Sequence, residues 1–436
     1  MSNIWITDNH IPIALNATDK RFNHCLITDT VKSDLELIAK YKIGNKFDGK
    51  RDVLVFPRDI NECKDKIRDN YIISLQGDQI STNNIMGFVG VNGTQLDIRS
   101  RFADNDKEDY FLHYMLQKVF SINLFDIKHT SNKEHVFDFL MYLFPYHLKK
   151  ALAQGLFKKY RTFEHNDANI RGVIDVSRHI RQNIPFRGTV AYNTRTHSYD
   201  NEITQLIRHT IEFIKTKPSG GVVLNNDLET RQCVSQIVAA TPTYKSTLRN
   251  KIIGQNLRPV RHPYFGAYTM LQSLCIKILR HESIKFGNEK DKVYGILFDG
   301  AWLWEEYLAT FLKDFTHPQN RTGKGRKHLF TDNSGYCYPD FYNNEIVLDA
   351  KYKGYTDWSK VQGDDLYQVI TYMHILNLQR GGFIVPKETA NLTPKTLNGV
   401  GGEMHIYGMT VNHEADSFWD YAKAMKKEEN TFLNQI

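Results

Sequence analysis

Apolar positions in the first hundred residues recur in the short, interrupted manner of β-strands. Glycine and asparagine break these runs, which lie at residues 51–57, 71–77 and 86–100. The last run contains Asn92-Gly93, a pair typical of a two-residue hairpin turn. The pattern therefore predicts a small β-rich domain with one or two helices over residues 1–105.

Helical spacing replaces this pattern in the middle of the chain, residues 106–285. Apolar residues recur there every three or four positions, in segments at 107–120, 135–160, 200–215 and 263–281. The spacing predicts a mostly helical region. Basic residues between positions 149 and 187 have few acids among them, which fits either contact with DNA phosphates or a solvated basic surface. We expect this region to contact a partner protein or DNA.

The last part of the chain, residues 286–436, alternates between the two patterns. A helix is predicted at 301–315 and another at 365–379, and strands are predicted at about 327–331, 336–342, 345–352 and 382–386. Helices and strands that alternate in this way are typical of an α/β domain. The expected fold class is therefore an α+β multidomain protein with a β-rich N-terminal domain, a helical middle and a C-terminal α/β domain.

Composition restricts the class of protein further. The chain has 436 residues, of which 41% are hydrophobic, so it is long enough to bury more than one core. No apolar run is long enough to cross a membrane, and the first residues do not have the pattern of a signal peptide. The five cysteines form no C-x-x-C pair, which argues against a disulfide framework. We expect a cytoplasmic protein without a membrane partner, and the net charge of +7 is compatible with a nucleic-acid partner.

The stretch YPDFYNNEIVLDAKYK, residues 338–353, places charged residues inside an apolar run. With Asn343-Asn344 as a two-residue turn, Asp340 would face Val347 across a hairpin. Side chains alternate along a strand, so Asp340, Asp349 and Lys351 are predicted to share one face, with the two carboxylates on diagonal positions. The opposite face is apolar and is expected to pack on helices.

Two carboxylates that converge in this way are suited to a hard divalent cation such as Mg²⁺. A metal ion held by Asp340 and Asp349 could activate water for phosphodiester cleavage. Lys351 could orient the water or offset negative charge. A simple Asp–Lys ion pair on a solvated strand face explains the same pattern, and both interpretations remain open at this point.

Residues outside the hairpin add to the candidate site. Glu305 flanks the apolar stripe of the helix at 301–315, so it could be a further metal ligand or could orient one. Gln368 and Tyr372 lie four residues apart on one helix face. A basic loop at 320–328 precedes the hairpin, and its candidate DNA-binding residues are Arg321, Lys324, Arg326 and Lys327.

The motifs YPDF, IVLDAKYK and DDLYQVITYM, in this order, resemble the PD-(D/E)xK nucleases and more narrowly McrC, the endonuclease subunit of McrBC restriction systems. The segments IRGVIDVSRHI (170–180) and DNEITQLIRHTI (200–211) resemble McrC as well. The resemblance covers residues 110–436. It implies a nuclease domain at 286–436 in which Asp340 and Asp349 bind metal, Lys351 is catalytic, and Gln368 and Tyr372 support catalysis.

The same resemblance implies a partner and a function. The partner would be a hexameric, GTP-hydrolysing AAA+ protein of the McrB type, which the N-terminal half would contact and stimulate. The chain would then be the Mg²⁺-dependent DNA endonuclease subunit of a restriction system for antiviral defence. Two alternatives stay open: a stand-alone nuclease of the same fold in repair or mobile-element biology, and a mainly regulatory subunit. Whether the chain forms a homodimer is left open too.

Overall fold

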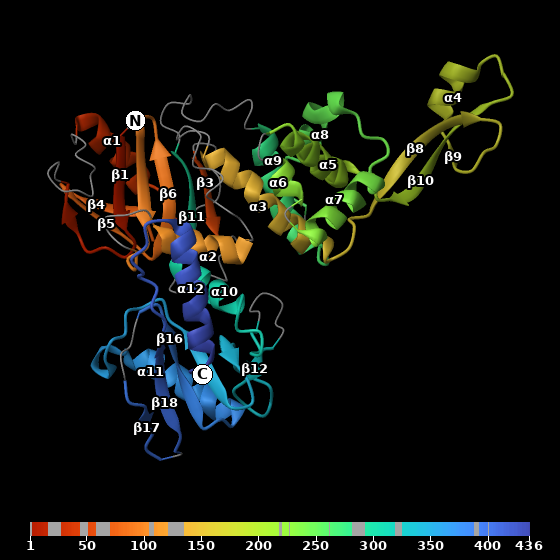
Figure 1. Cartoon of the computed structure of the whole chain (residues 1–436). Coiled ribbons are helices and arrows are strands. Elements are labelled where there is room, and N and C mark those ends of the chain that lie inside the picture. The colour runs from red at the N-terminus through yellow and green to blue at the C-terminus, as the bar shows by residue number, and fades with distance from the viewer. Residues whose placement is uncertain are drawn as a thin grey trace. The chain divides into compact units, whose positions relative to one another are not determined.

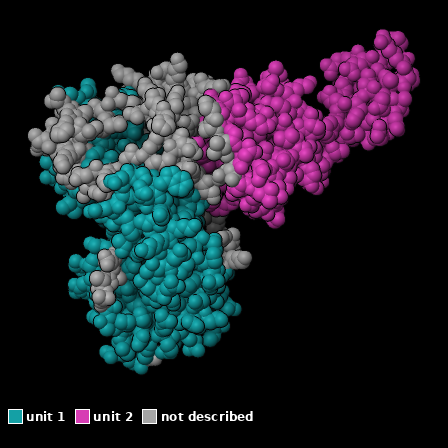
Figure 2. Space-filling view, viewed as in Figure 1, with its two compact units in different colours: residues 1–125, 286–436 teal, residues 126–285 magenta. Residues whose placement is uncertain are grey.

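The fold of this chain is given by a computed structural model. The residues that it describes are 2–15, 28–43, 51–57, 70–103, 109–120, 135–217, 220–225, 227–260, 262–280, 293–318, 325–387, 392–399 and 401–436. Contacts divide the chain into two compact units, which Figure 2 shows in different colours. The first unit joins residues 1–125 to residues 286–436, and the second contains residues 126–285. No helix within the described ranges is long and apolar enough to span a membrane.

The first unit begins with a mixed sheet of five strands. Their order across the sheet is β1 (Ser2–Thr7), β7 (Thr94–Arg99), β6 (Ile85–Val91), β11 (Val293–Asp299) and β3 (Arg51–Phe56). Strands β6 and β7 form the predicted hairpin, and Asn92 in its turn has a φ of 48°. Helix α1 (Asp29–Ala39) packs its apolar side on the sheet. A small sheet of β2 (Ile13–Ala14), β5 (Gln79–Thr82) and β4 (Ile73–Gln76) completes this region.

Strand β11 ties the two ends of the chain together. It follows the middle region in sequence, yet it lies between β6 and β3, antiparallel to the first and parallel to the second. The first and third predicted segments therefore share one sheet. The division into domains at residues 105 and 285 stays a prediction.

Three helices lie beside one another in the same unit (Figure 1). They are α2 (Tyr110–Phe120), α10 (Gly300–Ala309) and α12 (Phe418–Leu433). One carboxylate joins them, since buried Glu429 of α12 accepts hydrogen bonds from Tyr114 at 2.9 Å, Tyr307 at 2.9 Å and Lys118 at 2.8 Å. A buried carboxylate with three partners is fully satisfied, and it fixes how the helices meet.

The second sheet of this unit carries the candidate site. Its order is β14 (Phe341–Tyr342), β15 (Ile346–Ala350), β16 (Arg380–Val385), β18 (Glu403–Gly408) and β17 (Lys395–Thr396), and β15, β16 and β18 are parallel. Helix α11 (Gly363–Leu376) covers one face, and α10 contacts the other, where Trp304 donates to the carbonyl of Ile384 at 3.3 Å. Gly381 allows α11 to come close, because a Cβ there would lie 2.5 Å from the sulfur of Met373.

The predicted elements of this region are confirmed with one correction. Helices at 301–315 and 365–379 are α10 and α11, and strands at 345–352 and 382–386 are β15 and β16. The strand predicted at 336–342 is wrong, because it is split into β13 (Tyr336–Cys337) and β14. Pro339 lies between the two pieces and has no N–H to donate to a ladder. Strand β13 pairs instead with β12 (Lys327–His328). The short 3-10 helix Trp358–Lys360 precedes α11.

The second unit is mainly helical, and the helices predicted at 200–215 and 263–281 are confirmed as α5 and α9. Asn201 begins α5 as its N-cap and accepts hydrogen bonds from the N–H groups of Ile203 and Thr204. The helices of this unit outside its arm are α3 (His135–Leu152), α5 (Glu202–Lys215), α6 (Gly220–Asn225), α7 (Leu228–Ala240), the 3-10 helix Ser246–Leu248, α8 (Arg249–Gln255) and α9 (Gly266–Arg280).

One part of the second unit corrects the prediction of a mostly helical middle. Strands β8 (Lys159–Asp167) and β10 (Val190–Ser198) pair along their whole length, and β9 (Val173–Ile174) adds to β10. Helix α4 (Val176–Asn183) lies at the far end of this ribbon in Figure 1. We call residues 159–198 the arm. Its strands were missed because they are polar on both faces and lack the apolar alternation by which a half-buried strand is recognised.

Candidate active site

The β14–β15 hairpin has a different register from the predicted one. Phe341 pairs with Leu348 and Tyr342 with Val347, and the N–H of Asn343 donates to the carbonyl of Ile346 at 3.1 Å. The turn is therefore Asn344-Glu345, one residue later than predicted, and each residue of β14 pairs with a partner two residues further along β15. A shift of two residues keeps every side chain on its predicted face.

The observed register brings the two carboxylates closer than the predicted one would. Continued by one pair, it places Asp340 directly opposite Asp349 instead of diagonal to it, and directly opposed residues are the nearest neighbours across a hairpin. Both are buried, with 4% and 0% of their surface exposed. An Oδ2 atom of Asp340 accepts a hydrogen bond from the N–H of Ala350 at 2.8 Å. The interpretation as a solvated ion pair is therefore wrong on burial, since helix α11 covers this face.

Lys351 lies at the centre of the charged cluster. Its Nζ is 2.8 Å from an oxygen of Asp349, 2.9 Å from one of Asp365 and 3.0 Å from the side-chain oxygen of Gln368. Three acceptors match the three N–H donors of an ammonium group. Burial alone would lower the pKa of Lys351, but the two carboxylates outweigh it and raise the pKa above its ordinary value. The ammonium group is therefore charged and held in one position.

Helix α11 supplies the rest of the cluster. Gln368 uses its amide nitrogen to donate to the hydroxyl of Tyr372 at 2.7 Å, so the predicted pair is brought together and Gln368 links it to Lys351. Asp365 lies three residues before Gln368 on the same helix face, and it contacts Lys353 at 2.8 Å as well as the hydroxyl of Tyr355.

Sequence reasoning missed Asp365, although it stands inside the quoted motif. Burial would raise its pKa, but hydrogen bonds from Lys353, Tyr355 and Lys351 hold the pKa below its ordinary value. Asp365 is therefore an anion that two lysines share. Its spacing of three residues from Gln368 was the signal that could have identified it.

Glu305 lies near the hairpin through an intermediate side chain. Its Oε1 is 3.9 Å from Nδ1 of His317, and the same nitrogen donates to the backbone carbonyl of Asp340 at 2.7 Å. The ring of His317 stacks on that of Phe341 with 4.8 Å between centroids. His317 was also missed, because it is 23 residues from Asp340 in sequence and stands in no motif.

The described residues offer two carboxylates as candidate metal ligands. Asp340 and Asp349 fit a hard cation such as Mg²⁺, which is commonly held by one or two carboxylates with water in the remaining positions. Within the described ranges, no three His, Cys, Asp or Glu side chains are grouped so that together they could hold a metal ion. The two carboxylates therefore fit a magnesium site in which water fills most of the positions. Glu305 lies near His317 and forms no three-ligand group with them among the described residues.

Two of the four candidate DNA-binding residues can be placed. Arg326 is exposed, with its guanidinium group 5.5 Å from the ring centre of Tyr336, and the ammonium of half-buried Lys327 lies 5.0 Å from that of Tyr342 in the hairpin. Arg321 and Lys324 lie outside the described residues. The basic segment thus contacts the β14–β15 hairpin at Lys327.

These features define the class: a multidomain protein of mixed α/β architecture, with two buried carboxylates and a partly buried lysine beside them on a largely parallel sheet. The family model described as McrBC 5-methylcytosine restriction system component matches residues 80–386. The match covers most of the chain, which belongs to this family. The resemblance to a component of McrBC systems is confirmed.

Two solved structures are similar to the chain at low identity. One is a half-complex from a tetradecameric assembly of Thermococcus gammatolerans McrB AAA+ hexamers with bound McrC; the identity is 13% over 98% of this chain and 100% of that chain, with a TM-score of 0.44. The other is the Thermococcus gammatolerans McrBC complex, at 14% identity over 72% of this chain and 87% of that chain, with a TM-score of 0.32. Similarity at this level supports no assignment of residues. No curated protein matches the chain.

Proposed function

We propose that this chain is the DNA-cleaving component of a McrBC-type restriction system, and that it hydrolyses phosphodiester bonds with Mg²⁺ in the cytoplasm. The observation that carries the proposal is the cluster of buried Asp340 and Asp349 with partly buried Lys351 on one face of the β14–β15 hairpin. Charged groups held at this depth cost folding free energy, so their presence is most simply explained by chemistry.

Each residue of the cluster has a distinct task in this proposal. Asp340 and Asp349 would hold Mg²⁺, which when bound polarises the phosphate and lowers the pKa of water. Lys351 keeps a positive charge where negative charge develops on the phosphate. Asp365 and Gln368 fix its ammonium group, since they accept two of its three hydrogen bonds. Tyr372 holds the Gln368 amide with its hydroxyl oxygen.

Partner binding is the second half of the proposed function. One of the similar structures contains McrB AAA+ hexamers with bound McrC, and we propose that this chain likewise binds and stimulates a GTP-hydrolysing AAA+ partner. The arm supports the proposal, because it exposes large apolar side chains to solvent, and exposed apolar patches often bind other proteins. We call these exposed residues the tip patch; they are Ile170, Val173, Ile174, Val176, Ile180, Ile184 and Phe186.

The decisive experiment is cleavage of methylated and unmethylated plasmid with and without the candidate partner, in GTP or ATP, with Mg²⁺. Asp349→Asn should abolish cleavage, because the substitution keeps the shape of the side chain and removes the charge of a metal ligand. Glu345→Gln is the matched control, since Glu345 is an exposed carboxylate in the turn of the same hairpin. Full cleavage by folded Asp349→Asn protein would refute the site. Stimulation of the partner with no cleavage by the wild-type chain under any condition would favour the regulatory alternative.

A further inference from the structure

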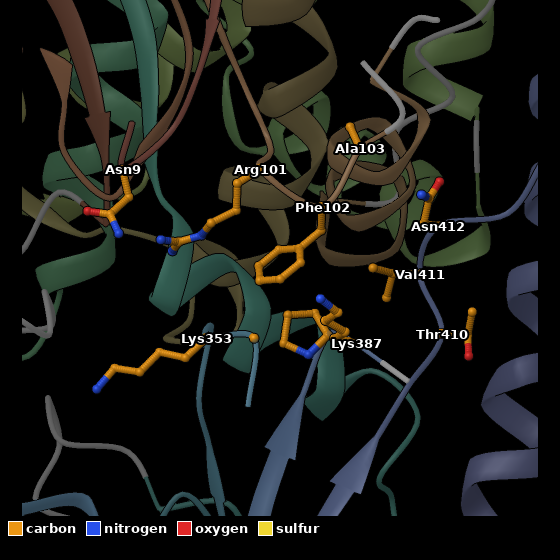
Figure 3. A pocket seen from close by; sticks show the side chains of 11 residues that line it. Asn9, Arg101, Phe102, Ala103, Lys353, Lys387, Thr410, Val411 and Asn412 are labelled. Carbon is orange, nitrogen blue, oxygen red and sulfur yellow. The ribbon is translucent and has the colours of Figure 1, made fainter. Parts of the chain in front are cut away.

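A cavity of about 700 Å³ lies in the first unit (Figure 3). Residues that follow β15, β16 and β18 line one side of it, among them Lys353, Lys387 and Asn412. Residues that follow β1 and β7 line the other side, namely Asn9 and Arg101 to Ala103. The cavity thus gathers the carboxyl ends of strands from two sheets, which is where α/β proteins commonly bind ligands.

The charges around the cavity are of one sign. Arg101, Lys353 and Lys387 line it, and none of its described lining residues is acidic. No described residue pairs with the exposed side chain of Lys387. Asn9 and Asn412 add neutral amide groups that can donate hydrogen bonds. A cavity lined in this way favours an anion.

The acids that pair with two of these cations do not line the cavity. Arg101 is 3.3 Å from an oxygen of Asp8 and donates to the carbonyl of Tyr352 at 3.0 Å. Burial raises the pKa of Asp8 to about 7, although Arg101 opposes the shift. At neutral pH, Asp8 therefore offsets only part of the arginine charge.

Lys353 connects the cavity to the proposed catalytic lysine. The two ammonium groups contact the two oxygens of one carboxylate: Lys351 is 2.9 Å from Oδ1 of Asp365, and Lys353 is 2.8 Å from Oδ2. Both lysines leave the end of β15 on the same side, because they are two residues apart. An anion beside Lys353 would therefore lie next to the position of the reacting phosphate.

We propose that this cavity binds a phosphate group of the DNA backbone together with its sugar. This backbone unit would lie beside the unit that is cut. The volume exceeds the need of a bare phosphate, and Phe102 and Val411 offer apolar surface to a sugar. The DNA source of the phosphate rests on the proposed nuclease function. The same chemistry would fit a free mononucleotide, so the test has to separate the two sources.

The first arm of the test measures binding of a labelled DNA duplex without divalent metal at several salt concentrations. Lys387→Ala should weaken binding and reduce the slope of log affinity against log salt by about 0.9, the value for one phosphate contact. Lys387→Arg should keep the slope. Lys426→Ala on α12 is the matched control, because Lys426 is an exposed lysine that does not line the cavity.

The second arm titrates a deoxynucleoside 5′-monophosphate into the wild-type and Lys387→Ala proteins by calorimetry. A loss of salt slope in the first arm supports a DNA phosphate, and a loss of only mononucleotide binding supports a free nucleotide. If Lys387→Ala folds and changes neither, the cavity is not a phosphate site. Binding is measured without metal, so absence of cleavage by the wild type would contradict the proposed function and leave this result readable.

Discussion

Two hairpin structures in this chain reverse the usual distribution of polar and apolar side chains, and they do so in opposite directions. The β14–β15 hairpin buries Asp340 and Asp349 under α11 and leaves Lys351 beside them only partly exposed. The arm, in contrast, exposes its apolar residues: Val173 is 78% exposed and Phe186 is 68% exposed. Most buried charges and most large exposed patches need a reason outside folding. On the proposed function, the first hairpin is the place for chemistry and the arm is the place for a partner.

The arm is stabilised by contacts that leave the residues of the tip patch available. One of its buried residues is Arg178, which donates to the carbonyl of Tyr192 at 2.8 Å and to that of His165 at 3.2 Å, and pairs with Glu164 at 2.8 Å. Gly172 permits β9 to approach β10, because a Cβ there would lie 2.1 Å from the carbonyl oxygen of Asn193. Polar contacts thus hold the arm together, and its apolar side chains remain for another surface.

Removing the lysine of the buried hairpin is the strongest way to break the comparison. Lys351→Ala should lower cleavage by about 100-fold or more, beyond the usual cost of losing a supporting residue. It should also lower stability by about 3 kcal/mol, because Asp349 and Asp365 lose a shared cation. Stimulation of the partner should persist. Plasmid cleavage, thermal unfolding and GTP turnover measure the three effects.

Lys351→Arg separates the two consequences of that change. Arginine keeps the charge between the carboxylates, so stability should return, but its planar group does not replace a compact ammonium and cleavage should stay low. The chemical role of Lys351 would be refuted if Lys351→Arg cleaved DNA at the wild-type rate, since charge alone would then be sufficient.

Removing the apolar surface of the arm tests the other side of the comparison. The double substitution Val173→Asp and Phe186→Asp should weaken partner binding on the order of 30-fold, the cost of losing a central interface contact. DNA binding by the isolated chain should not change. The matched control is Leu228→Asp, which alters an exposed apolar residue of α7 outside the tip patch. Equal GTP turnover with all three proteins would show that the partner binds elsewhere.

Deleting residues 1–105 would not answer the same question. Strand β11 lies between β3 and β6, so the deletion would remove both of its neighbours and leave its edges and apolar side chains exposed. Loss of stimulation could then follow from misfolding of the first unit. Substitutions on the arm avoid this difficulty because they change exposed side chains.

Asp365 sharpens the comparison at the β14–β15 hairpin, because it contacts Lys351 without being a predicted metal ligand. Asp365→Asn should lower kcat by about tenfold, within the range for residues that orient a site. KM for DNA should change little. Asp365→Glu should restore part of the rate because it retains the charge, whereas a merely structural role would not distinguish charge from shape. Equal kcat for Asp365→Asn and the wild type would remove Asp365 from the site.

The sequence predicted the faces of the β14–β15 hairpin but not its register. Alternation depends only on the parity of positions, so Asp340, Asp349 and Lys351 were placed on one face correctly. The turn was misplaced because the side chain of Asn343 accepts hydrogen bonds from the N–H groups of Glu345 and Ile346, at 2.8 and 2.9 Å. That local contact closes the turn one residue later than an Asn-Asn pair suggests.

Other features could not be predicted because their signals were tertiary. The apolar residues of α10 and α11 made those helices predictable, whereas the arm lacks a buried face and was missed. His317 contacts Asp340 only in the folded chain. Strand β11 pairs with β6, although the second unit separates the two strands in sequence. The metal and DNA roles of the site residues stay predictions, and the mutations above test them.

The smallest expected effect concerns the basic residues that precede the β14–β15 hairpin. Arg326→Ala should reduce the salt slope of DNA binding by about 0.9, because its exposed guanidinium is free to approach a phosphate. Lys327→Ala should have a weaker effect, since Lys327 is half-buried against Tyr342. Arg326→Lys keeps the charge and serves as the control. The measurement is anisotropy of a labelled duplex at four or more salt concentrations. Wild-type affinity and slope in both alanine variants would show that this segment does not touch the DNA backbone, and Arg321 and Lys324 would then be the next to neutralise.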